Sequence, residues 1–565
     1  MYYDYTVEIP KIRGKIVTNK VKNTTYVCYE FGRVYNAEKK YNTPKRTTIG
    51  KVSEKDPDRM YPNLNYLKFF PDAEIPEEKE SGRSSCLKIG AYLAIRKIIK
   101  DCKLEKHLSE HFSERDLGLL LDLAAYSIIT EDNAGQYYPD YTYNHPLLTQ
   151  GMKMYSDATV SYFLNNSITA DQRIGFLEGW NVVRDHRERI YVSYDSTNKN
   201  CQAGDVEIAE LGHAKDDPGK PIINYAVAYD CNNREPLFYE DYCGSINDVS
   251  QLKQMIDKAQ AYGYRNIGFI LDRGYFSQSN IHHMDKCGYH FVIMMKGMKE
   301  LVNELVLSVK GSFEERRDCA VKEFHVYGTT VKRQLYPSDE KDRYFHIYYD
   351  SAKVHKERED LEDRLDKMSK NMAKHYGEKD VTVGPGIRKY YVVEEHRDGT
   401  FLGIDEINEV IEKELKLSGY FVIITSEKMT AADALRLYKG RDASEKLFRG
   451  DKSYLGNKSY RNHHTESVDA KIFIEFIALI VRSRMHVLLS DENKRQDSKK
   501  NYLNVPAAIR QLEKLEMIRL PGNVYRQDHA ITATQKTILG AFNMTTNYMK
   551  NAIRELSETL TELEA

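Results

Sequence analysis

The sequence contains no Cys-x2-Cys pair, and none of its eight cysteines has a spacing to a histidine that is typical of a zinc site. This absence argues against a zinc-finger module. The cysteines are therefore predicted to be buried or free thiols in a reducing cytosol.

The sequence also lacks a long apolar run that is free of charge. Its most apolar stretch, residues 472–489, contains Glu475, Arg482 and Arg484, which predicts a buried core helix rather than a membrane span. The first ten residues lack the charged-then-apolar pattern of a signal peptide, which argues against export. We expect a cytoplasmic protein with no membrane partner.

An excess of charge of either sign is missing too. Lys and Arg number 83 and Asp and Glu number 84, so the net charge is −1 and any nucleic-acid binding must come from local basic patches. One such patch is the segment 11–22, which has five basic residues and no acidic one. The 565 residues, 41% hydrophobic and 30% charged, indicate a multidomain globular protein.

Changes of pattern along the chain divide it into five parts. They are an N-terminal β-rich arm (1–80), a helical region (81–185), an α/β core (186–297 and 419–490), an insertion of strands with one charged helix (298–418) and a mostly helical C-terminal region (491–565). In the charged helix, Leu361, Leu365, Met368 and Met372 form an apolar stripe.

The core has the pattern β, β, β, α, β, α, β. Three consecutive strands are predicted at 189–195, 221–230 and 234–242, and two more, each after a helix, at 266–272 and 289–296. Right-handed crossovers would place the first and fourth strands side by side at the centre of a mixed sheet.

Each of these two strands is predicted to end in an aspartate, Asp195 and Asp272. Neighbouring strands lie about 4.8 Å apart, so the two carboxylates can reach one metal ion. The structural alternative is turn chemistry, since Asp is common where strands end.

A third element is a predicted helix over 437–452, with Thr430 and Asp433 as a capping pair before it. On one continuous helix its Tyr438, Arg441, Glu445 and Lys452 fall within a sector of about 60°. The alternative reading is a solvated face with an ion pair between the second and third of these residues.

Two strand-end aspartates, a β-rich insertion and then a Y-x2-R-x3-E-x6-K helix resemble the DDE transposases of bacterial insertion sequences, in particular the group typified by insertion sequence four. The "DRGY" at 272–275 is similar to the surroundings of that family's second aspartate. The resemblance covers about 190–490. It implies a ribonuclease H-like core interrupted by the insertion, and DNA-end binding by the N-terminal helical region.

For the chemistry, the resemblance implies hydrolysis at the transposon ends and transfer of the freed 3′ ends to target DNA. Two Mg²⁺ ions, replaceable by Mn²⁺, would be held by Asp195, Asp272 and Glu445, because hard carboxylate oxygens suit Mg²⁺. Asp195 would bridge both ions. The family also implies a homodimer that holds two double-stranded DNA ends in a synaptic complex, associated with the nucleoid.

Four residues are implied in DNA contacts, namely Tyr438, Arg441, Lys452 and Arg273. For the three residues of the predicted helix, the structural alternative is to hold Glu445 in place by ion pairing. Some relatives also use a tryptophan of the insertion to receive a flipped base. This insertion has none, and three tyrosines are open candidates for the role, namely Tyr327, Tyr390 and Tyr391.

Two other functions are compatible with the same residues. One is a domesticated DNA-binding protein that no longer cuts DNA, although an intact acidic trio argues against it because unused buried carboxylates are costly. The other is a DNA nuclease that hydrolyses without strand transfer. Terminal inverted repeats around the gene would distinguish a mobile element from both.

Overall fold

The computed structural model divides into two compact units, Met1–Gln172 with Ser453–Asn457 and Asp469–Ala565, and Arg173–Lys452 with Lys458–Val468. The structure describes residues 2–3, 5–21, 24–36, 40–73, 82–184, 189–202, 205–295, 298–442, 446, 450, 452, 455–456, 459–496, 499–520 and 524–563.

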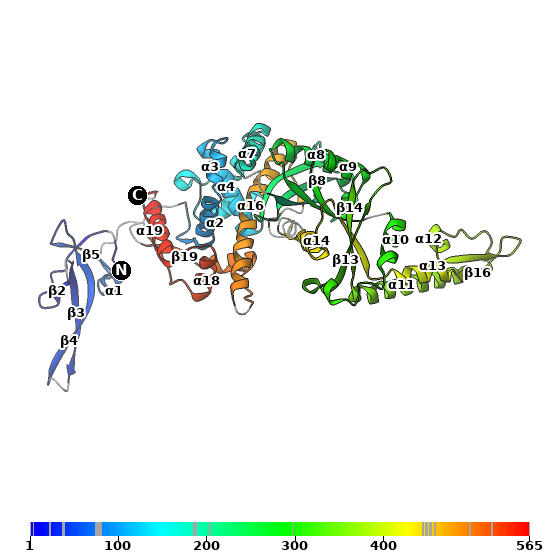
Figure 1. Cartoon of the computed structure of the whole chain (residues 1–565). Helices are drawn as coiled ribbons and strands as arrows, with labels where there is room; N and C mark the ends of the chain where they lie inside the picture. The colour runs from blue at the N-terminus through cyan, green and yellow to red at the C-terminus, as the bar shows by residue number, and fades with distance from the viewer. Residues whose placement is uncertain are drawn as a thin grey trace. The chain divides into compact units, whose positions relative to one another are not determined.

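The first unit starts with a five-stranded antiparallel sheet, drawn in blue in Figure 1, in the order β1-β5-β4-β3-β2. Its elements are β1 (Val7–Glu8), β2 (Ile16–Val21), β3 (Thr24–Asn36), β4 (Tyr41–Val52), β5 (Arg59–Pro62) and the short helix α1 (Leu64–Phe69). Val27, Ile49, Met60 and Tyr66 form its core. The basic segment 11–22 includes β2 and the turn before it.

The rest of this unit joins distant parts of the chain. β6 (Cys86–Lys88) pairs with β19 (Glu516–Leu520), which pairs with β20 (Val524–Gln527). The helices are α2 (Gly90–Asp101), α3 (Leu104–Ser109), α4 (Glu114–Thr130), α5 (Tyr138–Asn144), α6 (Asp157–Asn166), α17 (Val505–Leu512), α18 (Ala533–Ala541) and α19 (Thr546–Leu563). The helical segment after residue 81 and the C-terminal segment therefore share one sheet.

Two further helices are α7 (Ala170–Val182) and α16 (Thr465–Arg495). α16 contains the most apolar stretch of the sequence, and Glu475 and Arg482 within it are buried. The prediction of a buried helix is thus confirmed. Within the described part of the chain, no helix combines the length and the apolar character that a membrane span requires.

The second unit contains a ten-stranded mixed sheet in the order β12-β13-β14-β17-β11-β10-β7-β8-β9, with β18 paired to β7. Its strands are β7 (Ile190–Cys201), β8 (Ile222–Asp230), β9 (Glu235–Cys243), β10 (Ile267–Leu271), β11 (His290–Met294), β12 (Ala320–Val321), β13 (Val326–Gln334), β14 (Asp342–Tyr349), β17 (Tyr420–Thr425) and β18 (Ser459–Tyr460).

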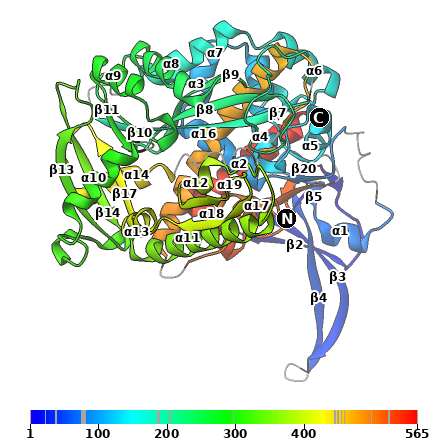
Figure 2. The same ribbon diagram turned by 90° about the vertical axis from the view of Figure 1, so that its right-hand side faces the viewer.

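The predicted order of strands and helices in the core is confirmed. α8 (Asp248–Ala261) and α9 (Gln278–Lys286) precede β10 and β11, respectively, and lie side by side (Figure 1, Figure 2). β7, β10 and β11 are parallel, and β7 pairs directly with β10. The expectation that the first and fourth strands are neighbours is therefore correct.

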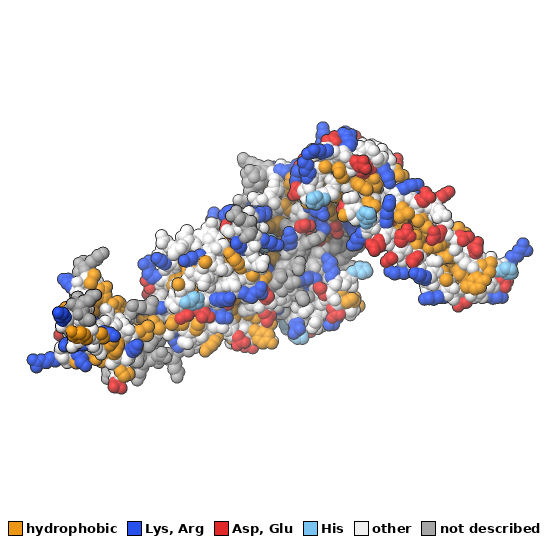
Figure 3. Space-filling model, turned by 90° about the horizontal axis from the view of Figure 1, so that it is seen from below, with side chains coloured by type: hydrophobic (Ala, Val, Ile, Leu, Met, Phe, Trp, Pro, Cys, Tyr) orange, Lys and Arg blue, Asp and Glu red, His pale blue; other side chains and the backbone are white. Residues whose placement is uncertain are grey.

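The segment between β11 and β17 contributes to the same sheet. β12, β13 and β14 extend it, because β14 pairs antiparallel with β17. The remaining elements are α10 (Lys299–Val309), α11 (Ser351–Met372), α12 (Pro385–Arg388), the hairpin of β15 (Tyr391–Glu395) and β16 (Phe401–Glu406), and α13 (Asn408–Lys416). Figure 3 shows acidic and basic side chains interleaved over this last group, as expected of a charged helix.

The apolar stripe of α11 packs against the hairpin, since Leu361 and Leu365 share a core with Tyr390 and Tyr391. Both tyrosines are buried, and the Tyr391 hydroxyl donates a hydrogen bond to the carbonyl of Leu365. Neither can therefore stack on a flipped base without leaving this core. Of the three tyrosines considered for that role, Tyr327 on β13 is the one that is partly exposed.

Candidate active site

The first aspartate lies within a strand rather than at its end. β7 continues past Asp195 to Cys201, so the prediction that Asp195 closes the strand is wrong. Polar residues follow it in sequence, but the side-chain amides of Asn198 and Asn200 bind the backbone of residues 213–217 at 2.9–3.1 Å. Because these contacts satisfy buried polar groups, the strand can remain paired with β8 as far as Asn200.

The second aspartate directly follows its strand, one position beyond the predicted place at the strand's last residue. β10 ends at Leu271, which pairs with Tyr194, and Asp272 then begins a short turn at Arg273–Tyr275. β7 and β10 are parallel, so the residues that follow this pair, Asp195 and Asp272, lie side by side in the sheet.

Arg441 lies between the two carboxylates. Its Nη1 is 3.8 Å from Oδ2 of Asp195 and 3.8 Å from Oδ1 of Asp272. The side chains of Arg441 and Asp195 are each only 17% exposed, whereas that of Asp272 is 36% exposed. One guanidinium thus balances two carboxylates that project from neighbouring strands.

Tyr438 reaches the same place from α14 (Ala431–Lys439). Its hydroxyl donates a hydrogen bond of 3.4 Å to Oδ1 of Asp272, and its ring is buried among apolar residues of the sheet. The predicted cap of this helix is confirmed, because the Thr430 side chain accepts from the backbone N–H of Asp433.

The prediction of one continuous helix through 437–452 is wrong. α14 ends at Lys439, and a turn at Gly440 and Arg441 separates it from the helical backbone at residues 442, 446, 450 and 452. Gly440 is the C-terminal cap of α14, and its N–H still binds the carbonyl of Arg436 at 2.9 Å. Glu445 lies outside the described residues.

The structure places Lys452 in a different contact. Its Nζ forms an ion pair of 2.6 Å with Oδ2 of Asp216. Asp216 belongs to the loop that Asn198 and Asn200 hold against β7, and that loop also carries Lys215, whose Nζ donates to the carbonyl of Ser196 at 2.8 Å. Arg273, the remaining residue expected to bind DNA, has an exposed side chain.

Lys215 and Asp216 were not identified from the sequence. They lie in "GHAKDDPGK", a polar stretch without periodicity, and their position depends on two asparagines of β7. The pattern visible in the sequence is the run of three charged residues at 215–217, between two predicted strands and about twenty residues after the first aspartate.

Burial dominates the electrostatics of the site. It raises the pKa of Asp195 to about 6, and the charge of Asp272 adds to this increase. The Ser196 N–H, Arg441 and Lys215 act in the opposite direction because they stabilise the carboxylate. Burial likewise raises the pKa of Tyr438 to about 12, so its hydroxyl stays protonated and can donate to Asp272 at neutral pH.

These residues fit a divalent cation. Asp195 is a poorly solvated carboxylate with a raised pKa and a second carboxylate beside it, which is a position where a further positive charge is stabilising. The donors are carboxylate oxygens, which suit hard ions such as Mg²⁺ and Mn²⁺ rather than soft ones.

The comparison with protein families identifies this region. Residues 193–481 match the family described as "Transposase DDE domain". The match begins in β7, two residues before Asp195, and it includes Asp272, Tyr438, Arg441 and Lys452. No curated protein sequence matches the chain.

Among solved structures, the chain is similar to a piggyBac transposase in a synaptic complex with hairpin DNA, at 9% identity and a TM-score of 0.32 over 84% of this chain and 76% of that one. It is also similar to the Mos1 transposase in a paired-end complex with the left transposon end, at 8% identity and a TM-score of 0.14 over 40% of this chain and 65% of that one. Likeness at this level carries no argument about function.

Proposed function

The chain belongs to the family of the transposase DDE domain, and from this premise we propose that it is the transposase of a bacterial insertion sequence, of the group typified by insertion sequence four. It binds the ends of its element, hydrolyses the phosphodiester bond there and joins the freed 3′ ends to target DNA by transesterification. The observation that carries the proposal is the convergence of Asp195 and Asp272 on Arg441.

A ribonuclease H-like core is part of the proposal. Its support is the strand order β9-β8-β7-β10-β11, in which β8 is antiparallel to β7 while β10 and β11 are parallel to it. The proposed parts are the arm (1–80), the DNA-end-binding helical region (81–185), the core (186–297 and 419–490), the insertion (298–418) and the C-terminal region (491–565).

Family members use divalent metal ions, and we assign Asp195, Asp272 and Glu445 to hold two Mg²⁺ here. When bound, such ions activate the attacking water or hydroxyl and neutralise charge on the phosphoryl and leaving oxygens. The protein residues prepare the site for this charge. Burial keeps water away from Asp195, the Ser196 N–H fixes its Oδ1 at 2.9 Å, and the Tyr438 hydroxyl orients Asp272.

Arg441 has two tasks in this scheme. In the free protein it balances the charges of Asp195 and Asp272, each 3.8 Å away. In the DNA complex it turns to a phosphate beside the scissile bond, because a guanidinium binds phosphate oxygens in bidentate fashion. The exposed Arg273, directly after Asp272, contacts the neighbouring phosphate.

Lys452 also binds a DNA phosphate in the proposed complex. In the free protein its charge is held by Asp216, so binding DNA exchanges a carboxylate for a phosphate. This exchange explains why the Lys452 side chain is only 14% exposed although its ammonium group contacts a loop rather than the core. Two copies of the chain hold two ends in one synaptic complex on the bacterial nucleoid.

The test uses the purified full chain, labelled DNA that carries the terminal repeats flanking the gene, a supercoiled target plasmid and Mg²⁺. The expected products are nicked or cleaved ends with 3′ hydroxyls and, later, ends joined to the plasmid. Asp195→Asn should bind the labelled DNA with unchanged affinity and form neither product.

Each alternative function gives a different result. Binding without cleavage by the unaltered chain would establish a domesticated DNA-binding protein. Cleavage without joined products, with free 3′ hydroxyls present, would establish a nuclease. Cleavage by Asp195→Asn at the rate of the unaltered chain would remove the proposed ligand role of that residue.

A further inference from the structure

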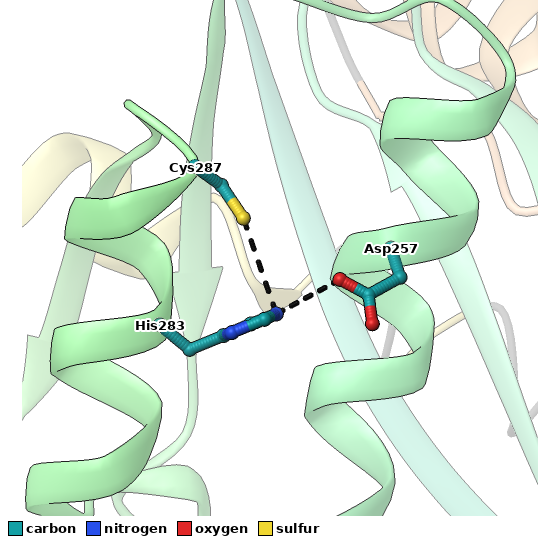
Figure 4. A group of neighbouring side chains, drawn as sticks. All are labelled: Asp257, His283 and Cys287. Atoms are coloured by element: carbon teal, nitrogen blue, oxygen red, sulfur yellow. Dashed lines mark hydrogen bonds and ion pairs between the residues drawn. The ribbon is translucent and has the colours of Figure 1, made fainter.

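A second group of possible metal ligands lies on the two helices α8 and α9, formed by Asp257, His283 and Cys287 (Figure 4). Oδ1 of Asp257 is 2.9 Å from Nε2 of His283, and Sγ of Cys287 is 3.9 Å from the same nitrogen. One ligand atom from each residue thus lies within 4.8 Å of the others. A carboxylate, an imidazole and a thiol meet at one point.

The secondary structure accounts for this convergence. His283 and Cys287 are four residues apart at the end of α9, so their side chains lie on the same face of the helix. Asp257 comes from α8, and the two helices are fixed to each other because the Asn280 side chain donates to the carbonyl of Val249 at 2.9 Å. The spacing of the three ligands is therefore set by helix packing.

Solvent access is compatible with an ion that enters from outside. The Asp257 side chain is 60% exposed and that of His283 is 22% exposed. Cys287 is partly buried and is a free thiol.

We propose that Asp257, His283 and Cys287 bind a Zn²⁺ ion, with water as the fourth ligand. In tetrahedral zinc sites, with bonds of about 2.0–2.3 Å, neighbouring ligand atoms are roughly 3.4–3.6 Å apart. The observed separations of 2.9 Å and 3.9 Å lie on either side of this value, so small side-chain rotations suffice. On binding, the thiol proton is released to solvent and the imidazole binds as its neutral form.

The donor set selects zinc over magnesium. A thiolate and an imidazole nitrogen are borderline or soft ligands, which Mg²⁺ does not prefer, whereas the catalytic aspartates offer oxygen alone. The site would fasten α8 to α9. Asn280 of α9 also donates to the carbonyl of Tyr275 at 3.0 Å, so α9 is held in place by hydrogen bonds whether or not an ion is bound.

Co²⁺ provides a direct probe, because a thiolate ligand gives a charge-transfer absorption band in the near ultraviolet. The protein is the metal-free full chain with Asp195→Asn and Asp272→Asn, which removes the two catalytic carboxylates. One equivalent of Co²⁺ should produce the thiolate band, and one equivalent of Zn²⁺ should abolish it, while a thousandfold excess of Mg²⁺ should leave it unchanged.

Variants locate the site. Cys287→Ser should lose the band, and His283→Ala should weaken Co²⁺ binding at least tenfold. The matched control is Cys319→Ser, which changes a partly exposed cysteine outside this group and should keep the band and the affinity for Co²⁺. Circular dichroism checks that each variant is folded. A band that persists in Cys287→Ser, or no band at stoichiometric Co²⁺ in a folded protein, would overturn the proposal. Because these readouts need no DNA, their failure is separate from that of the proposed transposase function.

Discussion

Two groups of possible metal ligands in the second unit differ in their donor atoms and in how they are built. Asp195 and Asp272 come from neighbouring parallel strands and share one arginine, and Asp195 is poorly solvated. Asp257 lies on a helix surface, is mostly exposed and is paired with a histidine. Both groups bring ligand atoms close together. Burial and the type of donor atom therefore decide which cation each site prefers and what the cation does there.

The largest expected effect separates the two groups by DNA cleavage. Asp195→Asn and Asp272→Asn should each lower the Mg²⁺-dependent cleavage rate by at least about 10³-fold, because each removes an ionised oxygen ligand of the metal. Asp257→Asn, the matched control with the same chemical change, should cleave at the rate of the unaltered chain. Single-turnover assays on end DNA measure all three rates.

Equal losses in all three variants would contradict this distinction. It would mean that the change acts through general folding rather than through a catalytic ligand. A mobility-shift assay with the same DNA separates these cases, since only a folded variant binds with unchanged affinity.

Arg441 is expected to have the next largest effect. Arg441→Ala should slow cleavage by about 10²–10³-fold, the usual cost of removing one charged donor that stabilises a transition state. Arg441→Lys should lose less, because it keeps the charge but not the planar fork that spans two oxygens. The readout is the cleavage rate at saturating DNA.

A faster rate in Arg441→Ala would contradict the DNA role. It would show that the guanidinium only competes with the metal ions for Asp195 and Asp272. Mg²⁺ titrations of both variants distinguish weaker metal binding from slower chemistry.

The third prediction concerns stability. The folded-state pKa of Asp195 is about 6, above its ordinary value of 3.8, so the folded protein binds this proton more tightly than the unfolded chain does. The stabilising effect of the proton is complete below about pH 3.8 and is lost as the pH rises through 6. Asp195→Asn carries no charge, and should therefore raise the free energy of unfolding at pH 7.5 without metal by about 1–3 kcal/mol.

Denaturation at two pH values measures this gain. The advantage of Asp195→Asn should shrink between pH 7.5 and pH 4, while Asp257→Asn should stay within about 0.5 kcal/mol of the unaltered chain at both. If Asp195→Asn lowers the free energy of unfolding at pH 7.5, neighbouring groups stabilise the Asp195 carboxylate by more than burial destabilises it.

A smaller effect is expected for Lys452, which tests one proposed contact with a DNA phosphate. Lys452→Ala should weaken end binding by about tenfold and lower the slope of log K against log salt by about 0.9, the value for one phosphate contact. The control is its partner, Asp216→Asn, which leaves the lysine charged and should bind DNA at least as tightly. An unchanged salt slope in Lys452→Ala would assign the lysine to the ion pair alone.

The smallest effect is expected for Tyr438→Phe. It removes one long hydrogen bond of 3.4 Å to Asp272 but keeps the buried ring, so cleavage should fall less than about fivefold. Tyr438→Ala should instead destabilise the fold by about 3–5 kcal/mol through the cavity it leaves. Thermal unfolding and the cleavage rate separate the two contributions, and a loss of 10²-fold in Tyr438→Phe would give the hydroxyl a direct catalytic role.

Regular patterns in the sequence predicted the centre of the fold well. Apolar runs separated by amphipathic helices gave the correct order of elements from β7 to β11, and crossover handedness gave the correct neighbours β7 and β10. The positions of Asp195 and Asp272 follow from that register. These features are local or depend on general chirality, so they are present in the sequence itself.

Features that depend on particular tertiary contacts were not predicted. The end of β7 was misjudged because Asn198 and Asn200 find partners in a loop that is not adjacent in sequence. The predicted helix of Tyr438 extends past Lys439, where α14 ends, because helical periodicity in the sequence continues beyond the turn at Gly440 and Arg441. Lys215 and Asp216 owe their positions to the same loop.

The proposed zinc ligands are not predicted from the sequence for a different reason. His283 and Cys287 lie four residues apart on a helix that the sequence predicts, but the prediction that no cysteine has a zinc-like spacing to a histidine leaves out a pair on one helix turn. Asp257 could not be added without knowing that α8 packs beside α9. The sequence therefore contains the spacing of His283 and Cys287, and only the packing of the two helices adds Asp257.

The central claim, that Asp272 is a ligand of the catalytic metal, is tested most directly by changing the softness of the ligand. Asp272→Cys should lose Mg²⁺-dependent cleavage and recover part of it in Mn²⁺, which accepts a thiolate more readily than Mg²⁺ does. Asp257→Cys should show no such change of metal preference. Cleavage by Asp272→Cys in Mg²⁺ at the rate of the unaltered chain would contradict the account.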